Sequence, residues 1–85
     1  MTGPTDRWYV YIVECADGTL YLGVSLDPQR RVGQHNAGRG ARYTRTRRPV
    51  TLLGSQPVAS RADALRLEKQ LKQRSPQRKR AFFAV

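Results

Sequence analysis

The strongest constraint on the fold is a pair of short apolar runs that lie close together near the N-terminus. Residues 8–13 read WYVYIV and residues 19–24 read TLYLGV, and both runs are rich in the aromatic and β-branched residues that favour strands. The segment between them contains Asp17-Gly18, a pair that is typical of tight turns. The sequence therefore predicts an antiparallel β-hairpin near the start of the chain.

The length of the turn decides which side chains share a face of this hairpin. A two-residue loop at Asp17-Gly18 would place Tyr11 and Tyr21 on opposite faces of the sheet. A three-residue loop, with Gly18 in the left-handed region, would place both tyrosines on the same face. Local propensity does not distinguish between these two registers, so both remain open at this point.

Capping, glycine and proline residues divide the rest of the chain into further elements. Asp27-Pro28 begins a helix that Gly38 ends, and Ser60 with Asp63 forms a variant of the capping box. The expected elements are a helix at 28–37, a loop at 38–49, a strand at 50–53 or 50–56, a helix at 61–74 and a short helix from 76. With the hairpin, the element order is β-β-α-β-α-α, an α+β pattern.

The chain has 85 residues, so it buries only ~60% of the surface that it exposes when unfolded. Leu, Ile, Val and Phe make up 18 of the 85 residues, a share just above the ~20% below which a highly charged chain reads as disordered. Composition alone therefore leaves a disordered basic peptide open, and the pattern favours a folded chain. Residues 1–7 are expected to form a disordered tail and residues 8–85 a single domain.

Two polar residues of the first helix are expected to face inward. At 100° per residue, Arg31 and His35 share one arc with Pro28 and Val32, which is the only large apolar residue of this helix. Whichever face packs against the sheet therefore carries both polar side chains with it. An alternative for His35 is a residue near the helix C-terminus that interacts favourably with the dipole.

The second long helix carries a carboxylate within its apolar arc. Glu68 projects between Leu65 and Leu71, and an unpaired buried charge is costly, so Glu68 needs a partner. One alternative is a structural ion pair with Arg31 or Arg61. The other is a functional role for this carboxylate.

The net charge indicates the class of partner. The chain has 16 Lys and Arg against 6 Asp and Glu, a formal charge of +10. Such a surplus favours a polyanion, nucleic acid before membrane, over the alternative of a merely soluble surface. Tyr43 lies among the basic residues of the loop at 38–49, where it could stack on an unpaired base or pack against the backbone of the loop. The arginines of this loop are expected to contact the phosphates of a nucleic acid. They are Arg39, Arg42, Arg45, Arg47 and Arg48.

The sequence does not support a disulfide-rich, cysteine-zinc, membrane-spanning or secreted protein. The single Cys15 excludes a disulfide framework and a cysteine zinc site, and it is typical of a reducing compartment. No apolar run approaches the ~20 residues of a membrane span, and the start of the sequence does not resemble a secretory leader. We therefore expect a cytoplasmic location and no membrane partner.

Six short motifs, taken in order, resemble one family. The family is the GIY-YIG nucleases, and the resemblance is closest to its small stand-alone YhbQ-like branch. Arg31 follows Tyr21 by ten residues and His35 follows it by fourteen, as in the family. The first motif departs from the family name because Tyr9 and Val10 replace Gly and Ile. The motifs are YVY at 9–11, YLG at 21–23, Arg31, HN at 35–36, GARYTR at 40–45 and RRPV at 47–50.

This resemblance implies a fold and an activity. The fold is a three-stranded antiparallel sheet flanked by helices. The activity is divalent-metal-dependent hydrolysis of phosphodiester bonds in DNA, with single-stranded or branched DNA of the repair and recombination type as the expected substrate. A protein partner that confers specificity is also expected. The alternative is a non-catalytic nucleic-acid-binding module on the same fold.

The resemblance also implies roles for five residues. Glu68 would hold Mg²⁺ or Mn²⁺, Arg31 would bind a phosphate oxygen, and His35 would exchange a proton. Tyr11 or Tyr21 would orient or deprotonate the attacking water, which requires that the pKa of a phenol, ordinarily near ~10, be depressed in the site. Both tyrosines must then face the metal. This mechanism predicts the three-residue register and a positive φ at Gly18.

Overall fold

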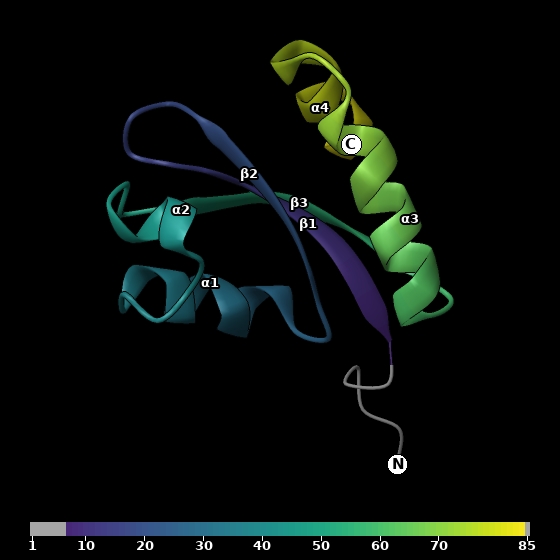
Figure 1. Ribbon diagram of the computed structural model, residues 1–85, viewed down its shortest axis with the longest axis horizontal. Helices are drawn as coiled ribbons and strands as arrows, with labels where there is room; N and C mark the ends of the chain where they lie inside the picture. The colour runs from purple at the N-terminus through teal and green to yellow at the C-terminus, as the bar shows by residue number, and fades with distance from the viewer. Residues whose placement is uncertain (1–6, 85) are drawn as a thin grey trace.

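The computed structural model describes residues 7–84. The predicted tail at 1–7 thus lies outside the described residues except for Arg7, which is exposed. Figure 1 shows a small sheet with helices on both of its faces. In chain order the elements are β1 (Trp8–Glu14), β2 (Leu20–Ser25), α1 (Pro28–Asn36), α2 (Arg42–Arg45), β3 (Thr51–Val58), α3 (Arg61–Lys72) and α4 (Pro76–Phe83).

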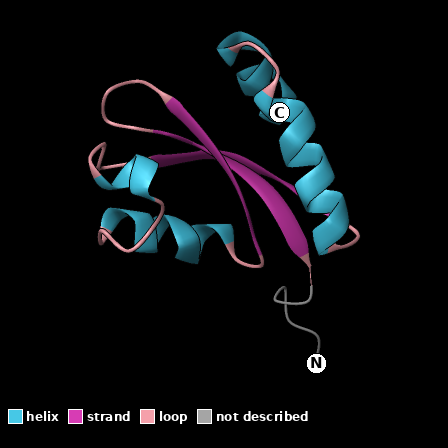
Figure 2. Ribbon diagram, in the orientation of Figure 1, coloured by secondary structure: helices cyan, strands magenta, loops and turns pink. Residues whose placement is uncertain are grey.

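The sheet has three strands in the order β2-β1-β3, and β1 is antiparallel to both of its neighbours. Helices α1 and α2 lie on one face, and α3 and α4 lie on the other (Figures 1 and 2). The expected α+β class with a three-stranded antiparallel sheet is confirmed.

The elements differ from the prediction by more than one residue in three places. The loop at 38–49 contains the short helix α2, because the N–H groups of Thr44 and Arg45 both donate to the carbonyl of Ala41. The strand β3 continues to Val58, and Pro57 is tolerated there because β3 is an edge strand. The helix α3 ends at Lys72, two residues before the predicted end. The element order is therefore β-β-α-α-β-α-α.

The hairpin has the three-residue register. The N–H of Cys15 donates to the carbonyl of Thr19 at 2.8 Å, and Gly18 has a φ of +85°. Tyr11 and Tyr21 therefore lie on the same face of the sheet, as the functional argument predicted.

Two apolar layers pack against the two faces of the sheet. The layer under α3 and α4 is the larger and is entirely apolar. The layer under α1 and α2 is smaller and includes the buried polar residues His35 and Thr44. The buried residues of the first layer are Val10, Ile12, Leu22, Ala64, Leu71 and Phe83, and those of the second are Tyr11, Val13, Cys15 and Val50.

One side chain ties the end of α1 to the start of β3. Asn36 accepts a hydrogen bond from the N–H of Val50 at 2.7 Å and donates one to the carbonyl of Val50 at 3.0 Å. Val50 is only 3% exposed, so its backbone groups depend on this amide.

The substitution Asn36→Ala is therefore expected to lower the free energy of unfolding by about 2–4 kcal/mol, because it leaves a buried donor and a buried acceptor unpaired. Urea denaturation measures this change. Gln70→Ala, at an exposed amide on α3, is the control and should change stability by less than about 0.5 kcal/mol. Equal stabilities of the two variants would contradict the assignment.

Candidate functional site

A buried chain of hydrogen bonds joins β1, α1 and α2. The hydroxyl of Tyr11 lies 2.9 Å from Nε2 of His35, and Nδ1 of His35 lies 2.7 Å from Oγ1 of Thr44. The Thr44 hydroxyl in turn donates to the carbonyl of Ala41 at 3.0 Å. Tyr11 is 1% exposed, and the other two side chains are fully buried.

The hydrogen bonds among Tyr11, His35 and Thr44 determine which ring nitrogen of His35 carries a proton. The single hydroxyl hydrogen of Thr44 is used on Ala41, so Thr44 accepts a hydrogen bond from Nδ1–H of His35. Burial, and then the positive charge of Arg31, lower the pKa of His35, so the imidazole is neutral at pH 7. Its Nε2 is consequently unprotonated and accepts the hydrogen bond from Tyr11.

Two glycines leave room for the hydrogen-bonded Tyr11 and His35. A Cβ at Gly23 would come within 2.6 Å of Cζ of Tyr11, and a Cβ at Gly40 would come within 2.8 Å of Cα of His35. The glycines of the YLG and GARYTR motifs are thus required by close packing rather than by backbone conformation. Gly40 and Thr44 are site residues that sequence reasoning missed, although both belong to a motif that it singled out.

The environment of Tyr11 raises the pKa of its hydroxyl. Burial, more than any other cause, raises the pKa of Tyr11 to about 12, and the charges of Tyr21 and Glu68 act in the same direction. Arg31 opposes this shift by hydrogen bonding and by its charge. The depression of a phenol pKa that the mechanism requires is thus not present at Tyr11 in the protein alone.

This pKa makes a prediction about stability. The folded state keeps the Tyr11 proton up to about pH 12, whereas the unfolded state loses it near pH 10.0, so stability falls as the pH rises between these values. The contribution is fully present below pH 10.0 and amounts to about 2–3 kcal/mol. Denaturant unfolding of the wild type and of Tyr11→Phe across this range measures it. The variant should lose less stability than the wild type, and equal losses would contradict the shift.

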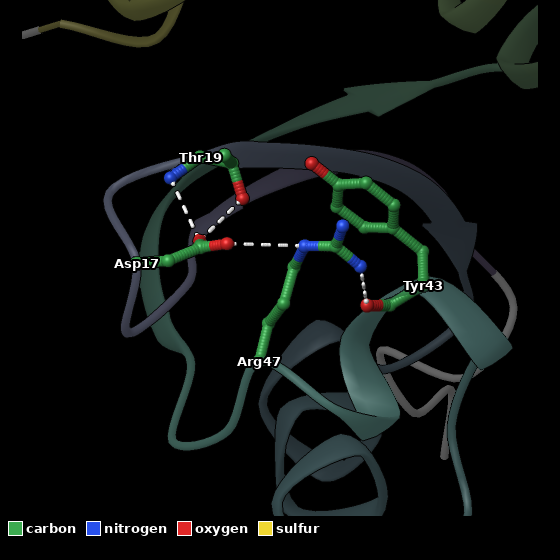
Figure 3. A network of polar contacts seen from close by, with 4 residues as sticks. All are labelled: Asp17, Thr19, Tyr43 and Arg47. Carbon is green, nitrogen blue, oxygen red and sulfur yellow. Dashed lines mark hydrogen bonds and ion pairs between the residues drawn. The ribbon is translucent and has the colours of Figure 1, made fainter.

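The second tyrosine is held by aromatic contacts. The ring of Tyr21 stacks on Tyr43 with centroids 5.8 Å apart and meets His35 edge-on at 5.4 Å. The guanidinium of Arg47 lies 4.0 Å from the centroid of the Tyr43 ring and donates to the carbonyl of Tyr43 at 2.8 Å. Arg47 also pairs with Asp17 of the hairpin turn at 3.1 Å (Figure 3). The Tyr43 ring therefore packs on the side chains of Tyr21 and Arg47.

Two opposite charges act on the hydroxyl of Tyr11 from the two sides of the sheet. Arg31, on α1, is half-buried and donates to Oε1 of Gln34 at 2.9 Å. Glu68, on α3, has a side chain that is 17% exposed. Both residues shift the pKa of Tyr11, so the electrostatic field at this hydroxyl depends on both helices.

The expected ion-pair partners of Glu68 were wrong. Within residues 7–84 its carboxylate pairs with Lys72 at 3.4 Å, one turn further along the same helix. Lys72 reaches Glu68 without crossing the sheet, whereas Arg61 lies over the ring of Trp8 at 5.7 Å. Arg31 has Gln34 as its hydrogen-bond partner.

The arginines of the loop are not equivalent. Arg47 is held by Asp17 and by the carbonyl of Tyr43, and Arg48 donates to the carbonyls of Arg45 and Asn36. The loop is acid-free in sequence, but Asp17 reaches it from the hairpin. The remaining three, whose side chains form no hydrogen bond or ion pair in the part of the chain that the structure describes, are the exposed Arg39, Arg42 and Arg45.

The motifs and this geometry agree with a known domain. The family model described as the GIY-YIG catalytic domain matches residues 7–81. The chain belongs to the GIY-YIG family. The resemblance that the motifs predicted is confirmed, and membership places the chain in a superfamily of nucleases.

Relatives of similar length match most of this chain. A UPF0213 protein of Halobacterium salinarum is 51% identical over 75 residues, which cover 88% of this chain and 97% of the relative. The solution NMR structure of a UPF0213 protein from Bacillus halodurans is 39% identical, with a TM-score of 0.55 over 89% of this chain and 81% of that one. The solution NMR structure of a protein from E. faecalis is 34% identical, with a TM-score of 0.59 over 89% and 82% of the two chains. These matches place the chain in the small UPF0213, or YhbQ-like, branch of the GIY-YIG family.

The departure in the first GIY-YIG motif has a structural explanation. Val10 points away from the site into the layer beneath α3 and α4, where any apolar side chain of suitable size packs. Tyr9 is half-buried and makes no side-chain hydrogen bond within residues 7–84. The third position, Tyr11, is the one that joins the buried chain, and it is retained.

The residues that surround Tyr11 fit a divalent cation with few protein ligands. Residues 7–84 contain no group of three or more His, Cys, Asp or Glu side chains that could hold a metal ion. Mg²⁺ commonly binds through one or two carboxylates and keeps water and phosphate as its other ligands. Glu68 is a largely buried carboxylate whose only ion pair in this region, at 3.4 Å, is long, so its oxygens fit such a cation.

No helix between residues 7 and 84 is long and apolar enough to cross a membrane.

Proposed function

We propose that this protein is a divalent-metal-dependent endonuclease that hydrolyses phosphodiester bonds in DNA. The observation that carries the proposal is the buried chain from Tyr11 through His35 to Thr44, with the charges of Arg31 and Glu68 acting on the Tyr11 hydroxyl. A polarised hydroxyl, an adjacent base, a cation and a carboxylate are the groups that hydrolysis of a phosphodiester requires.

The chain of hydrogen bonds can carry a proton away from the attacking water. Nε2 of His35 accepts the proton of the Tyr11 hydroxyl, and the resulting imidazolium keeps its Nδ1–H on Thr44. In the same step the Tyr11 oxygen takes a proton from the water whose oxygen bonds to phosphorus, so Tyr11 stays neutral, as its pKa of about 12 requires. The bond between phosphorus and the leaving sugar oxygen breaks, and that oxygen takes a proton from solvent. The negative charge of the bound phosphate favours the imidazolium, which offsets the effect of Arg31 on His35.

The other groups bind and orient the substrate. Arg31 binds a non-bridging phosphate oxygen, and Tyr21, held between Tyr43 and His35, orients the water. Mg²⁺ or Mn²⁺, held by Glu68 together with water and phosphate, would supply positive charge where negative charge develops on the phosphate. We assign the proton transfer to Tyr11 rather than Tyr21 because Tyr11 has the direct hydrogen bond to His35.

The exposed arginines support a nucleic-acid substrate. Arg39, Arg42 and Arg45 are exposed and can contact phosphates, and Arg47 and Arg48 add charge to the same loop. Stacking of a base on Tyr43 would compete with the contacts that its ring makes with Tyr21 and Arg47. We propose single-stranded or branched DNA of the repair and recombination type as the substrate, a partner protein that adds specificity, and a cytoplasmic location.

Metal removal tests the proposal. The full-length protein is expected to cleave single-stranded or branched DNA in Mg²⁺ or Mn²⁺ and to lose this activity in EDTA, because the phosphate charge is then not neutralised. Gel analysis of labelled single-stranded, duplex and branched substrates measures both outcomes. Binding of all three substrates with no cleavage in either metal would instead support a non-catalytic nucleic-acid-binding module.

A further inference from the structure

A hollow of about 320 Å³ opens beside Arg31 at the end of β2. Its walls combine apolar side chains from the sheet and the following turn with polar groups of α1. The lining residues that carry the argument are Trp8, Val24, Leu26, Arg30, Arg31 and Gln34. A second hollow of about 230 Å³ lies by the start of α1, but neither Arg31 nor any other cation lines it.

The lining of the first hollow suits a flat, heteroaromatic group. Trp8, Val24 and Leu26 offer an apolar surface, and Leu26 is 37% exposed at the margin. Gln34 uses Oε1 to accept from Arg31, so its two amide hydrogens remain for an acceptor on a ligand. Unpaired bases in protein sites are bound by this combination of aromatic or apolar contact and a few polar groups.

We infer that this hollow binds one unpaired nucleobase, on the nucleotide next to the phosphate that Arg31 contacts. The inference rests on the proposed function for its nucleic-acid ligand, and it names the feature of the substrate that the site reads. Arg31 both lines the hollow and acts on the Tyr11 hydroxyl, so a base in the hollow and a phosphate at Tyr11 belong to adjacent positions of one strand. A base in a duplex would have to leave its stack to enter, which disfavours duplex DNA.

The single tryptophan makes the inference measurable. Trp8 is the only Trp of the chain and it lines this hollow, so its fluorescence responds to a base that binds there. The probes are an oligomer of deoxythymidine of roughly 12 nucleotides and an abasic oligomer of the same length and charge. In EDTA, the thymidine oligomer is expected to quench Trp8 and to bind about 5- to 150-fold more tightly than the abasic one. Equal affinities, or unchanged Trp8 emission with the thymidine oligomer, would overturn the inference.

Two matched leucine variants test whether the difference in affinity between the two oligomers arises in this hollow. Leu26→Ala removes one wall of the hollow and should lower the ratio of the two affinities by about 2- to 5-fold. Leu53→Ala changes a leucine on β3 that is equally exposed, at 38%, and does not line the hollow, so it should leave the ratio unchanged. The same ratio for both variants would also overturn the inference.

These measurements separate the inference from the proposed function. Binding in EDTA does not depend on cleavage. Base-dependent quenching of Trp8 without any cleavage in Mg²⁺ or Mn²⁺ would therefore support base binding in the hollow and refute the nuclease activity. Metal-dependent cleavage with equal binding of the two oligomers would refute base binding in the hollow and would still support the proposed nuclease activity.

Discussion

Glu68→Gln is expected to lower kcat for DNA cleavage by about 10²- to 10⁴-fold while the affinity for DNA stays within a few-fold of the wild type. The substitution preserves the size of the side chain and removes the anionic oxygens that fit a divalent cation. The fold should survive, since the lost ion pair with Lys72 is an i,i+4 pair worth only about 0.3–0.5 kcal/mol. Single-turnover cleavage and equilibrium DNA binding on the same substrate measure the two quantities.

A second carboxylate on the same helix provides the control. Asp63 also forms an ion pair within α3, with Arg66 at 2.8 Å, but its side chain is 43% exposed and the residue lies in the first turn. Asp63→Asn should therefore leave kcat unchanged. Full activity of Glu68→Gln, or equal losses in both variants, would remove Glu68 from the reaction.

Tyr11→Phe is expected to lower kcat by about 10²- to 10⁴-fold with little change in KM. The variant keeps the ring that packs over Gly23 but removes the hydroxyl that donates to Nε2 of His35. It also leaves that nitrogen buried and unpaired, so stability should fall by about 1–3 kcal/mol. Steady-state kinetics together with denaturant unfolding separates the catalytic loss from the structural one.

The other tyrosines of the sheet test the assignment. Tyr9→Phe changes a half-buried phenol of β1 that lines the smaller hollow, and it should leave kcat unchanged. Tyr21→Phe should lose less activity than Tyr11→Phe, because in residues 7–84 Tyr21 contacts His35 through its ring alone. A larger loss in Tyr21→Phe would show that Tyr21 takes the proton and that Tyr11 positions His35.

Periodicity predicted much of the candidate site. The arc of Arg31 and His35 on α1 was visible from 100° spacing, and the structure brings His35 against Tyr11 and turns Arg31 toward the same hydroxyl. The inward position of Glu68 was predicted in the same way. The hairpin register, which propensity left open, followed from the requirement that Tyr11 and Tyr21 share a face, and it is confirmed.

The side chains that pair with the site residues were harder to predict than the faces on which the site residues lie. The sequence indicated that Glu68 needs a cation, but two arginines were expected where Lys72 is found. Residues 38–49 were predicted to form a loop, yet they contain α2, and Asp17 pairs with Arg47 across 30 residues of sequence. Such contacts depend on which segments pack together, and local spacing carries no information about that.

Local sequence pattern was enough to predict most of the strands and helices, their apolar faces, and the inward arcs that carry polar side chains. These properties follow from the backbone periods of 2 and 3.6 and from capping residues, which act over a few neighbours. Packing of the two layers on the sheet brings Thr44 to His35, places Gly40 where it makes room for His35, and raises the pKa of Tyr11 to about 12 by burial. Burial and long-range contacts arise only when both layers close on the sheet, because desolvation depends on everything that surrounds a group.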